Sequence, residues 1–394
     1  MSTAVYVVTD PGVSAFGAKG CSVHVQEVLR ELSGRFRAVH LITTRPGGVP
    51  PVGLTGVTVH ALPRPGGTDL AAREAAQRGA DELAARVLRR ICDTRHVTLV
   101  YQRYALWSAA ALETARRLGV PTVLEINAPL LTEQARHRGL HDGRAAQRWT
   151  RRALRAADAP FAVTGAVACW AQRLDPRRRR VPVIGNGVDV RRFVPVPRRC
   201  STESCAAEPV VAFASTFKPW HGLDLLVDSV ATARDRGAPL RLFLIGAGPE
   251  LARTVSRADR AGVPVSVTGQ VPPDRMPYLL RSADLAAAPY PAGKHYFSPL
   301  KVAEYLATGL PTVASAIADL PDLVTDGVEA LLPPPGDVAA TAAALVRLAG
   351  DPGLRHRMAV AARRAAVARM SWSAVVDVTL SLLPAPLQPI REAG

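Results

Sequence analysis

The sequence predicts an α/β protein made of two doubly wound domains, each with a mostly parallel sheet between layers of helices. The chain has 394 residues, which is longer than a single domain with one hydrophobic core usually is. Short apolar runs alternate with longer helical patterns in both halves, and a Pro-, Arg- and Ser-rich stretch without periodicity separates them. We therefore predict a first domain at 1–190, a linker at 191–208 and a second domain at 209–371.

The first half opens with the apolar run Val5-Tyr6-Val7-Val8, which predicts a strand. Helical patterns follow at 23–32 and 71–91, and a third helix is expected to end at Leu118-Gly119 because glycine favours helix ends. Further strands are expected at 38–42, 57–61, 98–101, 121–126, 161–164 and 181–184.

The second half repeats the alternation. Helical patterns separate its apolar runs, and two more, at 339–348 and 354–369, close the domain. Its strands are expected at 210–214, 240–245, 265–267, 285–288 and 312–314. In such sheets ligands bind beyond the carboxyl ends of the strands, which places the strand-end loops in a cleft between the domains.

The charge balance is strongly basic, with Lys+Arg 49 against Asp+Glu 33 and a net charge of +16. Such a balance suits nucleic acid, an anionic membrane surface or acidic small substrates. Aromatic residues do not interleave with the arginine clusters at 151–152, 177–180 and 198–199, as a single-strand binder would require. The clusters therefore favour solvated surface, and no nucleic acid partner is expected.

Five scattered cysteines contain no Cys-x-x-Cys pair, so neither a disulfide framework nor a zinc site is supported. The N-terminus lacks a basic leader region, and no apolar run approaches the ~18–20 residues that span a bilayer. No Asp-x-Asp pair or His/carboxylate spacing indicates a metal site. We expect a cytoplasmic protein without a metal, and contact with a membrane surface stays open.

The stretch at 297–315 predicts a phosphate-binding helix followed by a buried strand. Ser298 suits the N-cap, and Pro299 suits the first helical position, where its missing N–H costs nothing. Gly309 and Pro311 end the helix. The free N–H groups at its start would bind an anion, with help from the helix dipole.

Lys301 and Glu304 lie three residues apart and share one face of this helix. A cation near a phosphate and a carboxylate one turn deeper suit a nucleotide, because the carboxylate can accept hydrogen bonds from ribose hydroxyls. The alternative is an ordinary ion pair on an exposed helix.

This stretch resembles the C-terminal signature of the family 4 glycosyltransferases, which have the GT-B fold of two Rossmann-like domains facing a cleft. Members usually carry two spaced glutamates, a run of small residues, a glycine and Pro-Val. Glu304 matches the second glutamate, which holds the ribose, whereas Tyr296 stands in place of the first. The resemblance covers nearly the whole chain and implies that Ser298, Leu300 and Lys301 also bind the donor.

A glycine-rich loop at 10–20 joins the first strand to the first helix and suits an anion or a sugar. A flexible surface loop is the alternative. In the resembling family this loop faces the donor phosphates and the acceptor, which implies donor contacts for Gly17 and Gly20 and an acceptor-side position for Lys19. His24 follows as a possible base, against a structural role inside an amphipathic helix.

A second strand–loop–helix junction lies at 214–226. The family usually places a Gly-Arg and a Lys-Gly here, with both cations on the diphosphate. In this chain Lys218 and His221 are the cations expected there, and Gly222 matches the glycine. For Lys218 the alternative is a solvated loop lysine.

Gly246 and Gly248 form part of a dinucleotide fingerprint, but Leu251 replaces its last glycine and the match lies in mid-domain. The resemblance implies a glycine turn at the donor site instead, with Gly269 beside the nucleotide base. Fixed charge from Lys218, Lys301 and helix N-termini would then replace a metal at the departing diphosphate.

Arg103, Glu125 and Asn127 follow or end strands of the first domain and are the remaining acceptor-side candidates. Many family members have a histidine where Asn127 stands, so that residue's role does not transfer. Glu125 would act as a base or pair with an arginine. The Asn-Gly turn at 186–187 matches the family's hinge.

The resemblance implies a retaining, metal-independent glycosyltransferase that uses a nucleotide-diphospho-sugar and no cofactor. Lys218, Lys301 and Glu304 would be its catalytic residues, and a small molecule, a glycan or a lipid-linked sugar its acceptor. A closing helix at about 372–384 would cross back onto the acceptor-binding first domain. A sugar-nucleotide epimerase, a nucleic-acid-binding protein and a nicotinamide-dependent dehydrogenase remain as alternatives.

Overall fold

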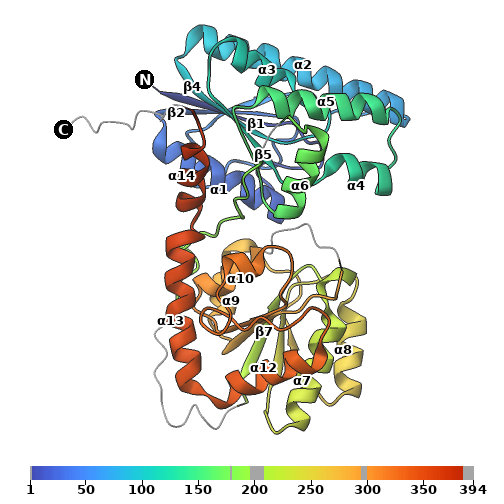
Figure 1. The fold of residues 1–394 in the computed structure, drawn as a ribbon, viewed down its shortest axis with the longest axis vertical. Helices are drawn as coiled ribbons and strands as arrows, with labels where there is room; N and C mark the ends of the chain where they lie inside the picture. The colour runs from blue at the N-terminus through green and yellow to red at the C-terminus, as the bar shows by residue number, and fades with distance from the viewer. Residues whose placement is uncertain (1, 178–179, 196–207, 294–299, 385–394) are drawn as a thin grey trace, which may run out of the picture. The chain divides into compact units, whose positions relative to one another are not determined.

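The computed structural model describes residues 2–177, 180–195, 208–293 and 300–384. Contacts between residues divide the chain into two compact units: Met1–Asn186 with Trp372–Gly394, and Gly187–Ser371. Each unit is one α/β domain with its own sheet and core (Figure 1). Of the predicted linker, residues 196–207 lie outside the described part.

The first boundary falls after Asn186 and not at the predicted residue 190. The next residues belong to the second unit because they bind its closing helix. The Val188 N–H donates to the carbonyl of Met370 at 2.8 Å, and the Arg363 guanidinium donates to the carbonyl of Val190 at 2.9 Å.

The first unit has a six-stranded parallel sheet with the order β3-β2-β1-β4-β5-β6. Alternate residues of β1 point to opposite faces. Tyr6 and Val8 pack in the core beneath α1 and α14, while Val5 and Val7 pack beneath α2 and α3. The strands are β1 (Thr3–Val8), β2 (Ala38–Thr43), β3 (Thr58–Ala61), β4 (Val97–Arg103), β5 (Thr122–Ile126) and β6 (Ala159–Ala162).

Helices cover both faces of this sheet, so the prediction of a doubly wound domain is confirmed. In Figure 1, α1 and α14 lie side by side, and Arg35 joins them through an ion pair with Asp377 at 2.7 Å. The helices are α1 (Gly20–Arg35), α2 (Leu70–Thr94), α3 (Ala110–Arg117), α4 (Leu130–His137), α5 (Gly143–Ala156), α6 (Gly165–Leu174) and α14 (Trp372–Ser381).

Two strand predictions in the first unit need correction. The strand predicted at 161–164 lies at Ala159–Ala162, because the Thr164 side chain already caps α6 by accepting a hydrogen bond from the Val167 N–H. The segment at 181–184 is not a strand. It makes a single bridge from Val183 to Ala162 at the edge of the sheet.

The second unit has a five-stranded parallel sheet with the order β11-β10-β7-β8-β9. Phe213 of the central strand β7 packs in the core with α7 and α12, and its neighbours Ala212 and Ala214 pack in the core with α10. Figure 1 shows β7 between these two layers. The strands are β7 (Val210–Ala214), β8 (Arg241–Ile245), β9 (Val265–Val267), β10 (Leu285–Ala288) and β11 (Thr312–Ala314).

Local signals fix several helices of the second unit. The carboxylates of Asp337 and Asp351 cap α12 and α13, and Pro352 occupies the first turn of α13. The elements are η2 (Pro219–His221), α7 (Leu223–Asp235), α8 (Leu251–Arg260), η3 (Pro273–Arg275), α9 (Met276–Leu280), α10 (Leu300–Ala307), α11 (Leu320–Leu323), α12 (Val338–Gly350) and α13 (Pro352–Arg369).

Candidate functional site

The loop after β7 is in direct contact with the glycine turn after β8. A β-carbon on Gly246 would lie 2.0 Å from the carbonyl oxygen of Ser215, and one on Gly248 would lie 2.0 Å from that of Thr216. Gly246 also has a φ of +127°, which favours glycine. These glycines therefore let two strand-end loops pass in direct contact.

Gly222 fixes the other end of the loop. Its φ is +69°, and a β-carbon there would lie 2.7 Å from the carbonyl oxygen of Pro289, just after β10. The residue also forms the N-cap of α7. His221 is thereby held where the chain turns from η2 into α7. Gly269 adopts a φ of +72° after β9 and pairs with Gly246 in an isolated bridge.

Two donors meet at one nitrogen of the His221 ring. The Ser215 Oγ lies 2.6 Å from Nδ1, and the Lys218 backbone N–H donates to the same Nδ1 at 3.2 Å. A backbone N–H can only donate, so Nδ1 accepts and the ring proton lies on Nε2. Burial, with the charges of Lys301 and Lys218, lowers the pKa of His221 to about 3.

The prediction that His221 supplies a cation is therefore wrong: the ring is neutral near pH 7. Its Nε2–H donates to none of the residues that the structure describes and stays available to a ligand. Lys218 is partly buried, and its ammonium has no ion-pair partner among the described residues.

Lys301 reaches the same loop from α10. Its ammonium lies 4.3 Å from the centre of the Phe213 ring and 5.4 Å from that of Tyr290, and it donates to Ser215 Oγ at 3.3 Å. Burial lowers the pKa of Lys301 to about 7, although Glu304 opposes this shift. A ligand anion would favour the charged form of the amine.

Glu304 lies one turn further along α10. Its carboxylate makes no ion pair with Lys301 and accepts no hydrogen bond from the described residues, which argues against the alternative of an exposed ion pair. Burial raises the pKa of Glu304 to about 7, against the lowering influence of Arg192 and Lys301. A partly buried carboxylate without a donor is suited to accept hydroxyl groups of a ligand.

Four side chains surround the end of β7. They supply two amines (Lys218 and Lys301), one N–H donor (His221) and one carboxylate (Glu304). Of the other residues predicted at this helix, only Leu300 is described, as the first residue of α10. Ser298, Pro299 and Tyr296 lie outside the described part. Two residues that the sequence analysis missed, Ser215 and Tyr305, hold this arrangement. Their contacts join segments far apart in the chain.

The glycine loop of the first unit is held by α1. Gln26 Nε2 donates to the carbonyl of Gly17 at 2.8 Å and to that of Ala15 at 3.2 Å. A β-carbon on Gly17 would lie 2.9 Å from Ser22 Oγ. Lys19 is the N-cap of α1 and Gly20 its first residue. These contacts tie the loop to α1.

Four of the acceptor-side candidates form a cluster in the first unit, whereas Lys19 is exposed at the start of α1. His24 and Glu125, 3% and 2% exposed, pair through Nε2 and Oε1. The His24 ring also packs edge-on against Trp372 of α14, with 4.7 Å between ring centres. Burial alone would raise the pKa of Glu125, but His24, Arg103 and Asn127 hold it below its usual value.

The cluster thus contains four residues that the sequence analysis named as acceptor-side candidates: His24, Glu125, Arg103 and Asn127. Glu125 Oε2 and Arg103 Nη1 are buried without a well-directed hydrogen bond. Tyr6 Oη, which the sequence analysis did not single out, shares this state. The burial of His24 and Glu125 favours a structural role for the contact between these two residues.

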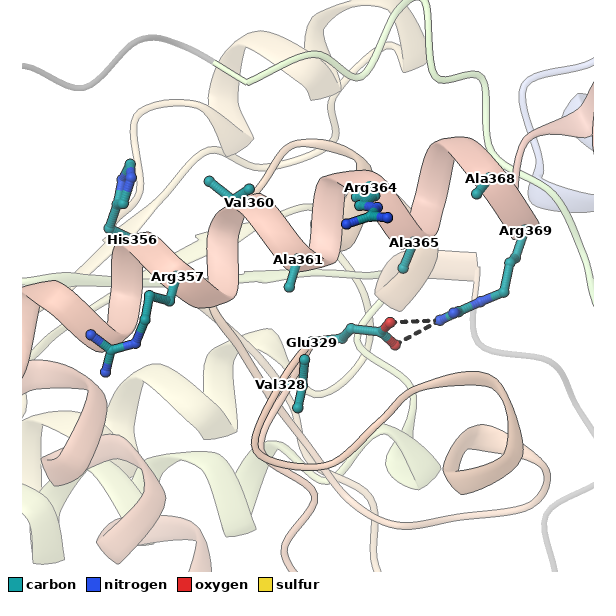
Figure 2. Close-up of a pocket in the computed structure, with 10 residues that line it drawn as sticks. All are labelled: Val328, Glu329, His356, Arg357, Val360, Ala361, Arg364, Ala365, Ala368 and Arg369. Carbon is teal, nitrogen blue, oxygen red and sulfur yellow. Dashed lines mark hydrogen bonds and ion pairs between the residues drawn. The ribbon is translucent and has the colours of Figure 1, made fainter.

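A hollow of about 610 Å³ lies elsewhere on the second unit, between α13 and the turn at 328–329 (Figure 2). Figure 2 shows Glu329 and Arg369 at one end of it, joined by an ion pair of 2.7 Å. None of the predicted site residues lines this hollow.

The described part of the chain contains no group of three or more His, Cys, Asp or Glu side chains placed to hold a metal ion. Among its helices, none combines the length and the apolar character needed to cross a membrane.

Two family models match the chain. The model for Glycosyltransferase Family 4 matches residues 18–192, and the model for Glycosyl transferases group 1 matches residues 208–351. A GDP-mannose-dependent alpha-mannosyltransferase of Mycobacterium tuberculosis is 32% identical over 286 residues, 70% of this chain and 69% of that protein.

A D-inositol 3-phosphate glycosyltransferase of Salinispora arenicola is 32% identical over 234 residues, 53% of this chain and 50% of that protein. The match thus spans about half the length of this relative. Among solved structures, HepE of Anabaena in complex with UDP has a TM-score of 0.68 at 20% identity, covering 96% of this chain and 99% of that one.

The sucrose-phosphate synthase of Thermosynechococcus elongatus has a TM-score of 0.67 at 18% identity and covers 96% of this chain and 98% of that one. At such identities the likeness concerns the fold alone. It confirms the GT-B fold of two Rossmann-like domains.

Proposed function

Because the chain belongs to glycosyltransferase family 4, we propose that it transfers a sugar from a nucleotide-diphospho-sugar to an acceptor hydroxyl. We further propose that the anomeric configuration is retained and that no metal ion takes part. The observation that carries the proposal is the arrangement at the end of β7. There, two amines and an N–H donor lie beside a carboxylate that accepts no hydrogen bond from the residues that the structure describes.

In this proposal the diphosphate lies at the loop after β7. Lys301 and Lys218 would offset the charge that develops on the departing diphosphate, and His221 would donate its Nε2–H to a phosphate oxygen. Glu304 would accept hydrogen bonds from the ribose hydroxyls, which a buried carboxylate without a donor favours.

We propose that the acceptor attacks from the same face as the departing diphosphate, whose oxygen receives the acceptor's proton. In this step the new glycosidic bond forms as the bond from the anomeric carbon to phosphate oxygen breaks.

The names of the relatives support specific donors and acceptors to test first. One relative is named for GDP-mannose and another for an inositol phosphate acceptor, and one structural neighbour was solved with UDP. We propose that the acceptor is a polyol or sugar hydroxyl of this kind. A lipid-linked acceptor at a membrane surface is the second choice.

Thermal unfolding in the presence of GDP, UDP, dTDP, ADP and NAD tests the proposal. A diphosphate at about 100 times its dissociation constant should add about 2.7 kcal/mol to the stability. Glu304→Ala should lose this gain, while the exposed α2 variant Glu82→Ala should keep it. Stabilisation by NAD alone would contradict the proposal, and so would stabilisation by DNA at low salt without any diphosphate response.

A further inference from the structure

Ser215 links two of the side chains that would bind the diphosphate. Its Oγ lies 2.6 Å from Nδ1 of His221 and 3.3 Å from Nζ of Lys301. His221 comes from η2 and Lys301 from α10, so one hydroxyl group connects the two elements. Ser215 is itself the first residue after β7 and rests on the glycine turn at Gly246.

The direction of these hydrogen bonds is fixed by chemistry. Lys301 donates to Ser215 Oγ, because the one proton of that hydroxyl is given to His221 and the oxygen can then only accept. Nδ1 of His221 already accepts from the Lys218 N–H, so the Ser215 hydroxyl can only donate to it. The chain of bonds therefore runs from Lys301 through Ser215 to His221, and leaves the His221 proton on Nε2.

We propose that Ser215 is a positioning residue for diphosphate binding, which holds His221 as a neutral Nε2–H donor beside the Lys301 ammonium. This inference rests on the proposed function, and it assigns a role to a hydroxyl group that the sequence analysis did not single out. Ser215 acts through His221 and Lys301 and need not touch the ligand.

The surrounding charges explain why a neutral ring is useful here. Burial lowers the pKa of His221, and the positive charges of Lys301 on α10 and Lys218 in the loop lower it further. Glu304, one turn beyond Lys301, lies beside Arg192. A protonated ring would add a third positive charge and would point a second N–H at the Lys218 N–H. A neutral donor binds a phosphate oxygen without that repulsion.

Nitrogen-15 NMR of the histidine rings tests, without any ligand, whether His221 is neutral and carries its proton on Nε2. The chain has nine histidines, and the signal that disappears in His221→Ala identifies the ring. We expect the wild-type ring to carry its proton on Nε2 and not to titrate between about pH 5.5 and 7.5, where an ordinary histidine changes charge. A ring with its proton on Nδ1, or one that titrates in this range, would overturn the proposal.

The same spectra of two Ser215 variants and one control variant test whether the Ser215 hydroxyl orders the His221 ring. Ser215→Ala should move the Nδ1 signal, because one of its two donors is gone. Ser215→Thr should restore it, since threonine keeps a hydroxyl at the same carbon. Thr216→Ala removes the neighbouring, exposed hydroxyl and should leave the spectrum unchanged. An unchanged signal in Ser215→Ala would contradict the proposal.

Calorimetric titration with GDP and UDP tests whether Ser215 contributes to diphosphate binding. Losing a hydrogen bond that orders a charged site should weaken affinity about tenfold or more in Ser215→Ala. The double variant Ser215→Ala/His221→Ala should bind at least about threefold better than the product of the single losses implies, because Ser215 acts through the ring. Multiplicative losses would show that Ser215 acts independently of the ring.

Binding measurements and ring spectra distinguish a failure of the proposed function from a failure of the role proposed for Ser215. If the wild-type protein binds neither GDP nor UDP nor another nucleoside diphosphate, the proposed function fails, while the ring spectra still decide the state of His221. If the wild-type protein binds a diphosphate and Ser215→Ala binds it equally well, the positioning role fails and the function stands. If Ser215→Ala does not fold, the wild-type spectrum and Ser215→Thr still decide the matter.

Discussion

The hydroxyl oxygen of Tyr305 accepts a hydrogen bond of 2.8 Å from the backbone N–H of Ala214. This bond joins helix α10 to the end of strand β7 inside the core. Lys301 lies one turn before Tyr305, and Ser215 directly follows Ala214. The bond therefore fixes the separation between the amine of Lys301 and the loop that it contacts.

Removing this hydroxyl should cost stability. Tyr305→Phe leaves the buried Ala214 N–H without a partner, which typically lowers the free energy of unfolding by about 1–3 kcal/mol. Urea denaturation measures the change. Tyr278→Phe is the matched control, because Tyr278 is 62% exposed. If Tyr305→Phe and the control were equally stable, the bond would not hold α10 in place.

The carboxyl of Glu304 should make stability depend on pH. Burial raises its pKa from 4.5 to about 7. Between these values the folded protein binds a proton that the unfolded chain has released, so this contribution to stability is present below pH 4.5 and is lost as pH rises to 7.

Glu304→Gln removes that dependence. We expect the variant to be more stable than the wild type by about 1–3 kcal/mol at pH 8, and the difference to vanish near pH 4. Urea denaturation at the two pH values measures it, with exposed Glu82→Gln as the control. A difference that does not change with pH would show that Glu304 titrates normally.

Gly248 should tolerate no side chain, because a β-carbon there would lie 2.0 Å from the Thr216 carbonyl oxygen. We expect Gly248→Ala to lower the free energy of unfolding by more than about 3 kcal/mol, or to displace the loop and abolish diphosphate binding. Gly350→Ala is the control: it lies in α12 with open space around it, and alanine favours a helix there. Normal stability together with normal binding in Gly248→Ala would rule out the close contact between the two loops.

Glu125 should contribute to stability through its buried pair with His24. Glu125→Gln removes the charged acceptor of this buried contact, and a hydrogen bond to a charged group typically contributes about 1.5–3 kcal/mol, so we expect a loss of this order at pH 7. The pKa of Glu125 is held below its usual value, so its contribution is present above about pH 4.5 and declines as pH falls further. An unchanged unfolding free energy with lost activity would instead indicate a direct role toward the acceptor.

Much of the fold could be predicted because strand and helix patterns are local. The apolar runs at 5–8 and 210–214 are the central strands of their sheets. The strand predicted at 181–184 was wrong because these apolar residues pack at a sheet edge, where Val183 makes only one bridge. Helices α4, α5 and α6 were not predicted. Of these, α4 buries none of its residues, so it lacks the apolar stripe that marks a helix.

The site could be predicted only in part. Lys301 and Glu304 were found because their spacing on one helix is visible in the sequence. Ser215 was missed because its value depends on contacts with His221 and with Lys301, which is 86 residues away. The neutral state of His221 likewise depends on burial and on two nearby lysines, which no local pattern records.

The central claim is that a nucleoside diphosphate binds at the end of β7 beside α10. Calorimetric titration of GDP and UDP into the wild type and Lys301→Met tests it most directly, with Arg260→Met on the exposed end of α8 as the control. We predict that one diphosphate binds the wild type and the control equally, and binds Lys301→Met at least about tenfold more weakly, as expected for a lost charge-assisted hydrogen bond. Equal affinity for all three proteins would contradict the claim.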